Sequence, residues 1–230
     1  MLKMNITIGS FAEAARVAEG TVVIIDVFRA FTTAAVAMQN GASRIIMVED
    51  IDQALSLREQ GVGRYCMGER RGIKPEGFDF GNSPAEIRNM RFDGETLIQT
   101  TSNGTRGVLA ATGASRIYAG SFISAGATVR AILADPTETV SLIAMGDKDQ
   151  VRTDEDEICA LYLRSLLQGR QPNISATAEL IKTMSPRLDG ATLTHEDIDS
   201  CLDIDAVSFA VRIHNENGQC VAVPERPDFS

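Results

Sequence analysis

Val22–Thr33 (VVIIDVFRAFTT) passes from four branched apolar residues directly into an aspartate, Asp26, with an arginine, Arg29, three positions later. A continuous branched run is typical of a strand that is buried on both faces, as in a parallel sheet. The residues that follow predict a helix from about Arg29 to Asn40, ended by Gly41. Asp26 therefore lies at the carboxyl end of a strand, where open α/β sheets bind their ligands.

The same alternation of apolar runs and helical stretches extends along the rest of the chain. Further strands are predicted over Met4–Ile8, Arg44–Val48, Tyr65–Met67, Thr96–Thr100, Arg116–Ala119 and Val140–Met145. After about residue 154 the pattern changes to amphipathic helices, followed by a hairpin around Asn217-Gly218. The sequence predicts an α/β fold, a three-layer α/β/α sandwich with a largely parallel or mixed sheet, C-terminal helices and a hairpin. We expect a single domain over residues 1–230, and leave open a helical-plus-hairpin lobe from about 147.

Several helix starts carry capping signals, among them Asp50 with Gln53 and the segment Thr194–Asp197. The spacing of Ser10 with Glu13, and of Thr153 with Asp156, is typical of a capping box. Ser83-Pro84 combines an N-cap residue with a proline in the first helical position.

Composition excludes several classes of protein. The chain has 230 residues, is 44% hydrophobic and carries a formal net charge of -9, so we expect no binding to nucleic acid or to anionic membranes. The four cysteines show no CxxC spacing, which favours buried free thiols in a reducing compartment. The first residues reach acidic side chains before a signal-peptide core could form, and we expect a cytoplasmic protein. Whether the protein forms a homodimer is not decided by the sequence.

Asp26 is the first candidate for chemistry. A carboxylate at a strand end can bind Mg²⁺ or act as a nucleophile or base. Arg29 and Thr32 can donate hydrogen bonds beside a helix N-terminus, which favours anions. The alternative is structural: an aspartate that caps its helix or pairs with Arg29. A haloacid-dehalogenase-type phosphatase would carry a second aspartate two residues after the first, and Phe28 occupies that position here.

The second candidate is the glycine-rich stretch Gly68–Pro84 (GERRGIKPEGFDFGNSP). Carboxylates and guanidinium groups need partners when they are enclosed, and a connection of this length is often functional. Candidate side chains in it are Glu69, Arg70, Asn82 and Ser83. The alternative is a solvated turn that only starts a helix.

Two further stretches are weaker signals on their own. Gln99–Arg106 (QTTSNGTR) follows an apolar strand and opens a helix, so Asn103, Gly104 and Thr105 could cradle an anionic group. Asp147–Glu157 contains Glu155 and Asp156 but is equally explained as a solvated helix start.

Taken together, these stretches resemble the 2-phosphosulfolactate phosphatase family of coenzyme M biosynthesis. The matching segments are Asp26–Thr33, Gly68–Arg70 with Gly77–Pro84, Thr101–Thr105 and the Glu155-Asp156 pair. They occur in order between about Val22 and Leu167.

The resemblance implies Mg²⁺-dependent hydrolysis of a small phosphorylated acid, most specifically of 2-phosphosulfolactate to sulfolactate and phosphate. Under this hypothesis Asp26, Glu69 and Arg29 are catalytic. Substrate binding falls to Arg70, Asn82, Ser83, Asn103, Gly104, Thr105 and Thr32. The metal ligands come from Asp26, Glu69, Glu155 and Asp156.

Three departures from the family pattern concern the substrate rather than the chemistry. Arg71 replaces a common glycine, Ser124 a common asparagine, and Met145 the alanine of an Ala-Gly pair. Two alternatives therefore remain: the same chemistry on another small phosphorylated acid, or a protein that binds such a metabolite without hydrolysing it. A sensor would need the arginines but not a cluster of carboxylates around Asp26.

Overall fold

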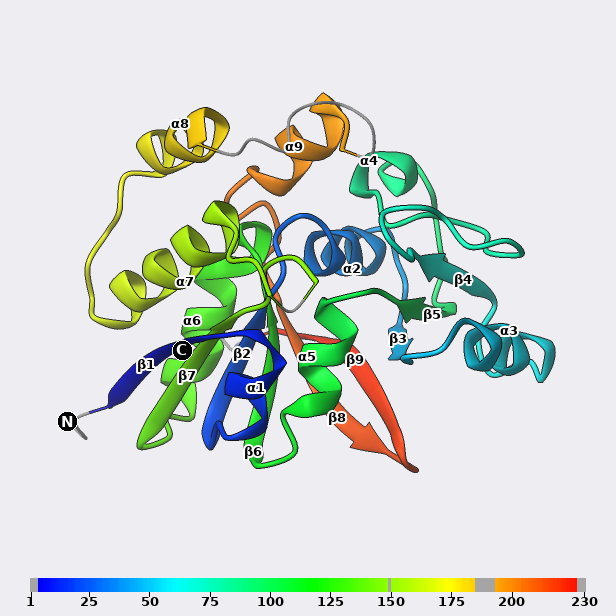
Figure 1. Cartoon of the computed structure of the whole chain (residues 1–230), viewed down its shortest axis with the longest axis horizontal. Helices are drawn as coiled ribbons and strands as arrows, with labels where there is room; N and C mark the ends of the chain where they lie inside the picture. Colours follow the sequence, from blue (N-terminus) through cyan, green and yellow to red (C-terminus); the bar gives the residue numbers. More distant parts are fainter. Residues whose placement is uncertain (1–3, 149, 185–192, 227–230) are drawn as a thin grey trace.

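A single mixed sheet is the centre of the molecule (Figure 1). The computed structural model describes residues 4–148, 150–184 and 193–226. The strands are β1 (Asn5–Ser10), β2 (Gly20–Ile25), β3 (Arg44–Met47), β4 (Tyr65–Gly68), β5 (Thr96–Thr100), β6 (Ala114–Gly120), β7 (Thr139–Ala144), β8 (Ala210–Glu216) and β9 (Gln219–Glu225). The helices are α1 (Phe11–Arg16), α2 (Ala30–Gln39), α3 (Ile51–Glu59), α4 (Pro84–Ile87), α5 (Gly104–Ala110), the 3₁₀ helix η1 (Phe122–Ser124), α6 (Ala125–Ala134), α7 (Asp154–Leu167), α8 (Ile174–Met184) and α9 (His195–Cys201).

The strand order is β1-β7-β2-β6-β8-β9-β3-β5-β4. Pairing is parallel within the groups β1-β7-β2-β6 and β3-β5-β4. The hairpin β8-β9 joins the two groups through antiparallel pairing with β6 and β3. Its two-residue turn, Asn217-Gly218, has positive φ at both residues, as a type I′ turn requires. The predicted α/β fold, with its mixed sheet, C-terminal helices and hairpin, is confirmed.

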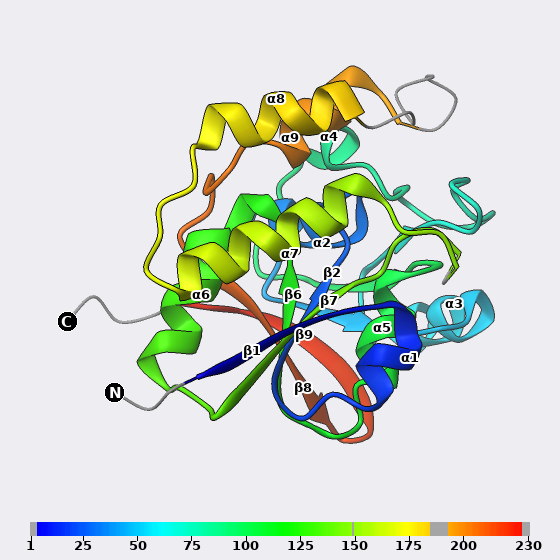
Figure 2. The same cartoon turned by 60° about the vertical axis from the view of Figure 1, so that its left-hand side comes forward.

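Helices cover both faces of the sheet (Figures 1 and 2). In β2 the side chains of Val22 and Ile24 belong to the core that includes α1, α2 and α5. Those of Val23 and Ile25 belong to the core with α6 and α7. This explains why β2 has no polar alternation, since both of its faces are buried.

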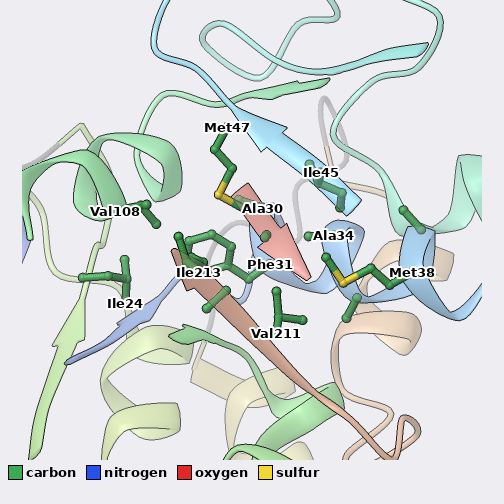
Figure 3. Packing of buried hydrophobic residues seen from close by; sticks show 14 of the residues in the cluster. Ile24, Ala30, Phe31, Ala34, Met38, Ile45, Met47, Val108, Val211 and Ile213 are labelled. Atoms are coloured by element: carbon green, nitrogen blue, oxygen red, sulfur yellow. The ribbon is translucent and has the colours of Figure 1, made fainter. Parts of the chain in front are cut away.

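Helix α2 is fixed by packing on all sides. Every residue from Ala30 to Met38 is buried. Figure 3 shows side chains of this helix, among them Phe31, packed with residues of β3, β8, β2 and α5. The turn that joins Asp26 to α2 is therefore held by a rigid element.

Two of the predicted caps are wrong. Ser10 makes no cap to α1 and donates its hydroxyl to Glu157 Oε1 at 2.8 Å. Thr153 makes no side-chain cap to α7, and Asp156 bonds elsewhere, as described below. The predicted cap at Ser83 is confirmed, because its hydroxyl accepts from the backbone N–H of Glu86 at 3.1 Å.

Cys66, Cys159 and Cys201 are buried free thiols, as predicted, and Cys220 is half-buried. Among the described helices none is both long and apolar enough to cross a membrane.

Candidate active site

Asp26 is the first residue after β2, as predicted, and its side chain is 6% exposed. Its backbone N–H donates to the carbonyl of Gly120 at 3.2 Å, so Asp26 lies between the ends of β2 and β6. Oδ1 accepts from the backbone N–H of Ala30 at 3.1 Å. Asp26 therefore does cap α2, but it does not form the ion pair with Arg29 that the spacing allowed: Arg29 pairs with another residue.

The electrostatic surroundings of Asp26 are strongly unfavourable to its charge. Burial raises its pKa from 3.8 to about 7; the charges of Glu69 and Glu155 add to this effect, and the N–H groups of Ala30 and Gly104 oppose it. A carboxyl with a pKa near 7 populates both protonation states at neutral pH.

Asp156 comes to the same place from the start of α7. Its Oδ1 accepts from the backbone N–H of Val27 at 2.8 Å, and its Oδ2 from that of Gly146 at 2.9 Å. The side chain thus joins the ends of β2 and β7, and this is why it does not cap its own helix. Burial raises the pKa of Asp156 well above its usual range, and the charges of Glu155 and Asp26 raise it further. Glu155 itself is 2% exposed.

Glu69 approaches from the other half of the sheet, directly after β4. The preceding Gly68 has φ +141, and a Cβ there would lie 1.9 Å from the carbonyl oxygen of Thr100, so only glycine lets the two strand ends come this close. Glu69 Oε1 accepts from the backbone N–H of Ser102 at 2.6 Å. Its Oε2 accepts from the N–H of Gly72 at 2.7 Å and the hydroxyl of Ser102 at 3.0 Å.

We call Asp26, Glu69, Glu155 and Asp156 the carboxylate cluster. The charges of Glu69 and Glu155 act on Asp26, and those of Glu155 and Asp26 act on Asp156, so the acidic residues predicted from three separate motifs lie within electrostatic range of Asp26. Local sequence alone had given the Asp147–Glu157 stretch only weak support. Asp149 of that stretch lies outside the described residues.

The turn Asn103-Gly104-Thr105 also contacts the cluster. A Cβ on Gly104 would lie 3.0 Å from Asp26 Oδ2 and 2.9 Å from the Cβ of Ala30, so glycine is required for this close approach. The Thr105 hydroxyl closes the turn by accepting from the N–H of Thr101 at 3.2 Å. The amide oxygen of Asn103 is buried and has no partner among the described residues.

The other predicted binding residues differ in whether the polar atoms of their side chains have hydrogen-bond partners in the described chain. The Thr32 hydroxyl is fully buried and donates to the carbonyl of Val27 at 3.0 Å. Asn82 is 7% exposed, and its Oδ1 has no partner within the described chain. Ser83 Oγ donates to Asp197 Oδ1 at 2.6 Å.

The two predicted arginines are both anchored. Arg29 Nη1 lies 2.5 Å from Asp197 Oδ2. Arg70 donates from Nη2 to the Thr100 hydroxyl at 2.7 Å, from Nη1 to the carbonyl of Glu69 at 3.0 Å, and to the carbonyl of Glu49. Asp197 is not among the residues predicted for the site, and its one signal in the sequence is its place in the helix start Thr194–Asp197.

A hollow of about 850 Å³ opens beside Glu69, at the ends of β3, β4 and β5. It is lined by Arg70, Arg71 and Arg106, by the acidic side chains of Glu49, Asp50 and Asp52, and by Ile51, Gln53, Thr101 and Ser102. Its size suits a small molecule, and its lining residue Ser102 donates a hydrogen bond to Glu69 of the carboxylate cluster.

Carboxylate oxygens suit a divalent cation such as Mg²⁺, and burial together with the charges of neighbouring carboxylates raises the pKa of both Asp26 and Asp156. In the described part of the chain no three acidic, histidine or cysteine side chains already form a metal-binding group. Mg²⁺ does not require such a cage, because it is usually held by one or two carboxylates, waters and substrate oxygens.

Comparison with known proteins agrees with this arrangement. A family model described as 2-phosphosulpholactate phosphatase matches residues 8–216. The chain belongs to this family. The match includes every residue of the carboxylate cluster, and the resemblance predicted from the four motifs is confirmed.

Relatives within the 2-phosphosulpholactate phosphatase family have similar names. A protein of Caldicellulosiruptor saccharolyticus named "Probable 2-phosphosulfolactate phosphatase" is 38% identical over 156 residues, 66% of this chain and 64% of that protein. Proteins with the same name are 34% identical in Clostridium acetobutylicum, over 70% of this chain and 68% of theirs, and 29% identical in Thermoplasma acidophilum, over 80% of this chain and 81% of theirs. The chain thus spans slightly less than two thirds of the Caldicellulosiruptor protein's length.

Proposed function

We propose that this protein is a Mg²⁺-dependent phosphatase that hydrolyses the phosphate monoester of a small acidic metabolite, with 2-phosphosulfolactate as the first substrate to test. The observation that carries the proposal is the carboxylate cluster around Asp26. A sensor that only binds an anionic metabolite would gain nothing from concentrating buried negative charge where its ligand lies. An enzyme that uses a cation needs that charge.

The residues that would hold Mg²⁺ are Asp26 together with one or more of Glu69, Glu155 and Asp156. When bound, the ion would polarise the phosphoryl oxygens and offset their charge. Asp26 is the preferred ligand because the charges of Glu69 and of Glu155, which come from separate motifs, both act on it.

The arginines and the Asn103-Gly104-Thr105 turn would bind and orient the substrate. Guanidinium groups suit phosphate oxygens because they donate two parallel hydrogen bonds. We assign the phosphate to Arg29, whose turn leads from Asp26 into α2, and a second acidic group of the substrate to Arg70 beside the hollow. Asn103, with its unpaired buried amide, would hold a further polar group of the substrate.

In the hydrolysis itself, water attacks phosphorus and the bond from phosphorus to the substrate's oxygen breaks. The water's proton passes to a carboxylate of the cluster, and the departing oxygen takes up a proton to become a hydroxyl group. We favour water over Asp26 as the attacking group, because Phe28 stands where an Asp-x-Asp enzyme would have its second carboxylate.

The test is release of inorganic phosphate from racemic 2-phosphosulfolactate and from a panel of small phosphate monoesters, each with and without Mg²⁺. Metal-dependent release with a preference for the sulfonated compound supports the full proposal. Metal-dependent release from another monoester keeps the chemistry and changes the substrate. Tight binding of these compounds without release from any of them would instead favour a sensor.

A further inference from the structure

Asp197 is a buried carboxylate that the proposed reaction does not use. Its side chain has 0% exposure and accepts hydrogen bonds from four donors. Oδ2 accepts from Arg29 Nη1 at 2.5 Å and from the N–H of Thr194 at 3.4 Å. Oδ1 accepts from Ser83 Oγ at 2.6 Å and from the N–H of Ala85 at 3.2 Å. Both oxygens are therefore fully engaged.

These contacts join three segments that are far apart in the sequence. Arg29 precedes α2, Ser83 caps α4, and Asp197 lies in the first turn of α9. Figures 1 and 2 both show α9 beside α4, above α2. A buried carboxylate that lost its guanidinium partner would be left with an uncompensated charge, so the three segments depend on one another.

Within the described chain, the Arg29 guanidinium is held through one of its nitrogens. Its Nη1 donates to Asp197, while its Nε and Nη2 donate to no residue that the structure describes. Its side chain retains 11% exposure. Freezing a free arginine costs up to about 2 kcal/mol of conformational entropy on binding. The ion pair has already removed most of that freedom, so the remaining donors of the guanidinium are presented in one orientation.

We propose that Asp197 is a positioning residue, which orients the Arg29 guanidinium for a phosphoryl group bound in front of Asp26. The proposal rests on the proposed function for the identity of the ligand, a phosphate group. Asp197 does not touch the substrate; it acts through Arg29, and Ser83 supports it from the other side.

The first experiment is a double-mutant cycle on kcat/KM with the variants Asp197→Asn, Arg29→Ala and the pair. Misplacing a binding group lowers kcat/KM by about 10- to 100-fold, which is the loss we expect for Asp197→Asn alone. In the Arg29→Ala background the same change should cost less than about threefold, because the group that Asp197 orients is gone. Losses that multiply in the double variant would overturn the proposal.

Asp199→Asn is the matched control. Asp199 lies two residues later in α9, its side chain is 71% exposed, and its pair with Lys182 is on the surface. It makes the same chemical change in the same helix, so wild-type kinetics are expected. Thermal unfolding of all variants separates loss of the fold from loss of orientation.

Calorimetric binding of inorganic phosphate distinguishes this proposal from the proposed function. We expect Asp197→Asn to weaken phosphate binding about tenfold and Asp199→Asn to leave it unchanged. If that result is obtained while the wild type hydrolyses no monoester, the phosphatase proposal fails and the positioning role stands. If the wild type is active but Asp197→Asn matches it in both assays, the positioning role fails and the phosphatase stands.

Ser83→Ala keeps the proposal testable should Asp197→Asn not fold. It removes one of the four donors to Asp197 and leaves the ion pair with Arg29 in place. We expect a smaller loss of kcat/KM, about three- to tenfold, that again nearly disappears in the Arg29→Ala background. A loss of equal size in both backgrounds would contradict the proposal.

Discussion

Asp26 and Asp197 are both buried aspartates that bond to residues at the start of α2, and the charged groups around them differ. Asp197 faces a guanidinium, a hydroxyl and two backbone N–H groups. The pKa of Asp26 is raised by burial and further by the charges of Glu69 and Glu155, and only backbone N–H groups are found to oppose this among the described residues. A balanced buried charge is part of the architecture, whereas an unbalanced one marks a place where a ligand or a proton is expected. The two aspartates are linked through Arg29, which follows Asp26 by three residues and pairs with Asp197.

The largest effect on activity is expected when the charge of Asp26 is removed. Asp26→Asn keeps the size and the acceptor that caps α2, but it removes the carboxylate. We expect phosphate release to fall by about 10²- to 10³-fold, as is typical when a central electrostatic group of an active site is removed. Steady-state assays with saturating Mg²⁺ measure this. A variant that kept most of its activity would make Asp26 a helix cap only.

Removing the divalent cation should be the next largest effect. In excess EDTA we expect activity to fall by about 100-fold or more, since the substrate and the cluster would then repel each other. An independent readout is stability: Mg²⁺ should raise the midpoint of thermal unfolding by about 2–5 °C.

The control for the metal prediction is Asp26→Asn, whose unfolding midpoint should not respond to Mg²⁺. Calcium and sodium at matched ionic strength test whether the response is specific. Full activity in EDTA would contradict the metal role, and an equal shift in both proteins would place the ion elsewhere.

Features of the site that depend on residues close together in the sequence could be predicted, whereas contacts between residues far apart in the sequence could not. The strands and the four motif loops were found because each is a local pattern, and the rule that parallel strands place their carboxyl ends together brought Asp26, Glu69 and Asn103 to one edge. The Arg29–Asp197 pair joins residues 168 positions apart, and no spacing pattern reports it. The caps predicted at Ser10 and Thr153 failed for the same reason, since Ser10 and Asp156 bond across the fold.

The third prediction concerns stability and pH. The pKa of Asp26 is about 7 in the folded chain against an ordinary value of 3.8, so folding favours its protonated form. Between about pH 4 and pH 7 the unfolded chain holds fewer protons at this site, and stability therefore falls as the pH rises. Asp26→Asn has no carboxyl to deprotonate, so its free energy of unfolding does not fall in this way. Relative to that of the wild type, the free energy of unfolding of the variant should rise by on the order of 2–4 kcal/mol from about pH 4 to pH 8.

Urea unfolding in EDTA across this pH range measures the difference. Asp199→Asn is again the control, since an exposed, paired carboxylate should change stability by less than about 1 kcal/mol at any pH. If the difference in the free energy of unfolding between Asp26→Asn and the wild type did not change with pH, the pKa of Asp26 would be the same in the folded and the unfolded chain.

The smallest effect is expected at Arg71, a cation that belongs neither to the carboxylate cluster around Asp26 nor to the contacts of Asp197. Arg71 lines the hollow, is exposed, and has φ +54, a left-handed conformation that favours glycine. Arg71→Gly should therefore leave stability unchanged or raise it by up to about 1 kcal/mol.

If the exposed guanidinium of Arg71 contacts a second acidic group of the substrate, Arg71→Gly should raise KM about two- to tenfold while kcat stays nearly constant, because an interaction made equally with substrate and transition state is lost. The loss should be greater for a doubly or triply charged monoester than for a singly charged one. Equal KM values for the two proteins across such a series would confine substrate recognition to the buried side of the site, between the carboxylate cluster and Arg29.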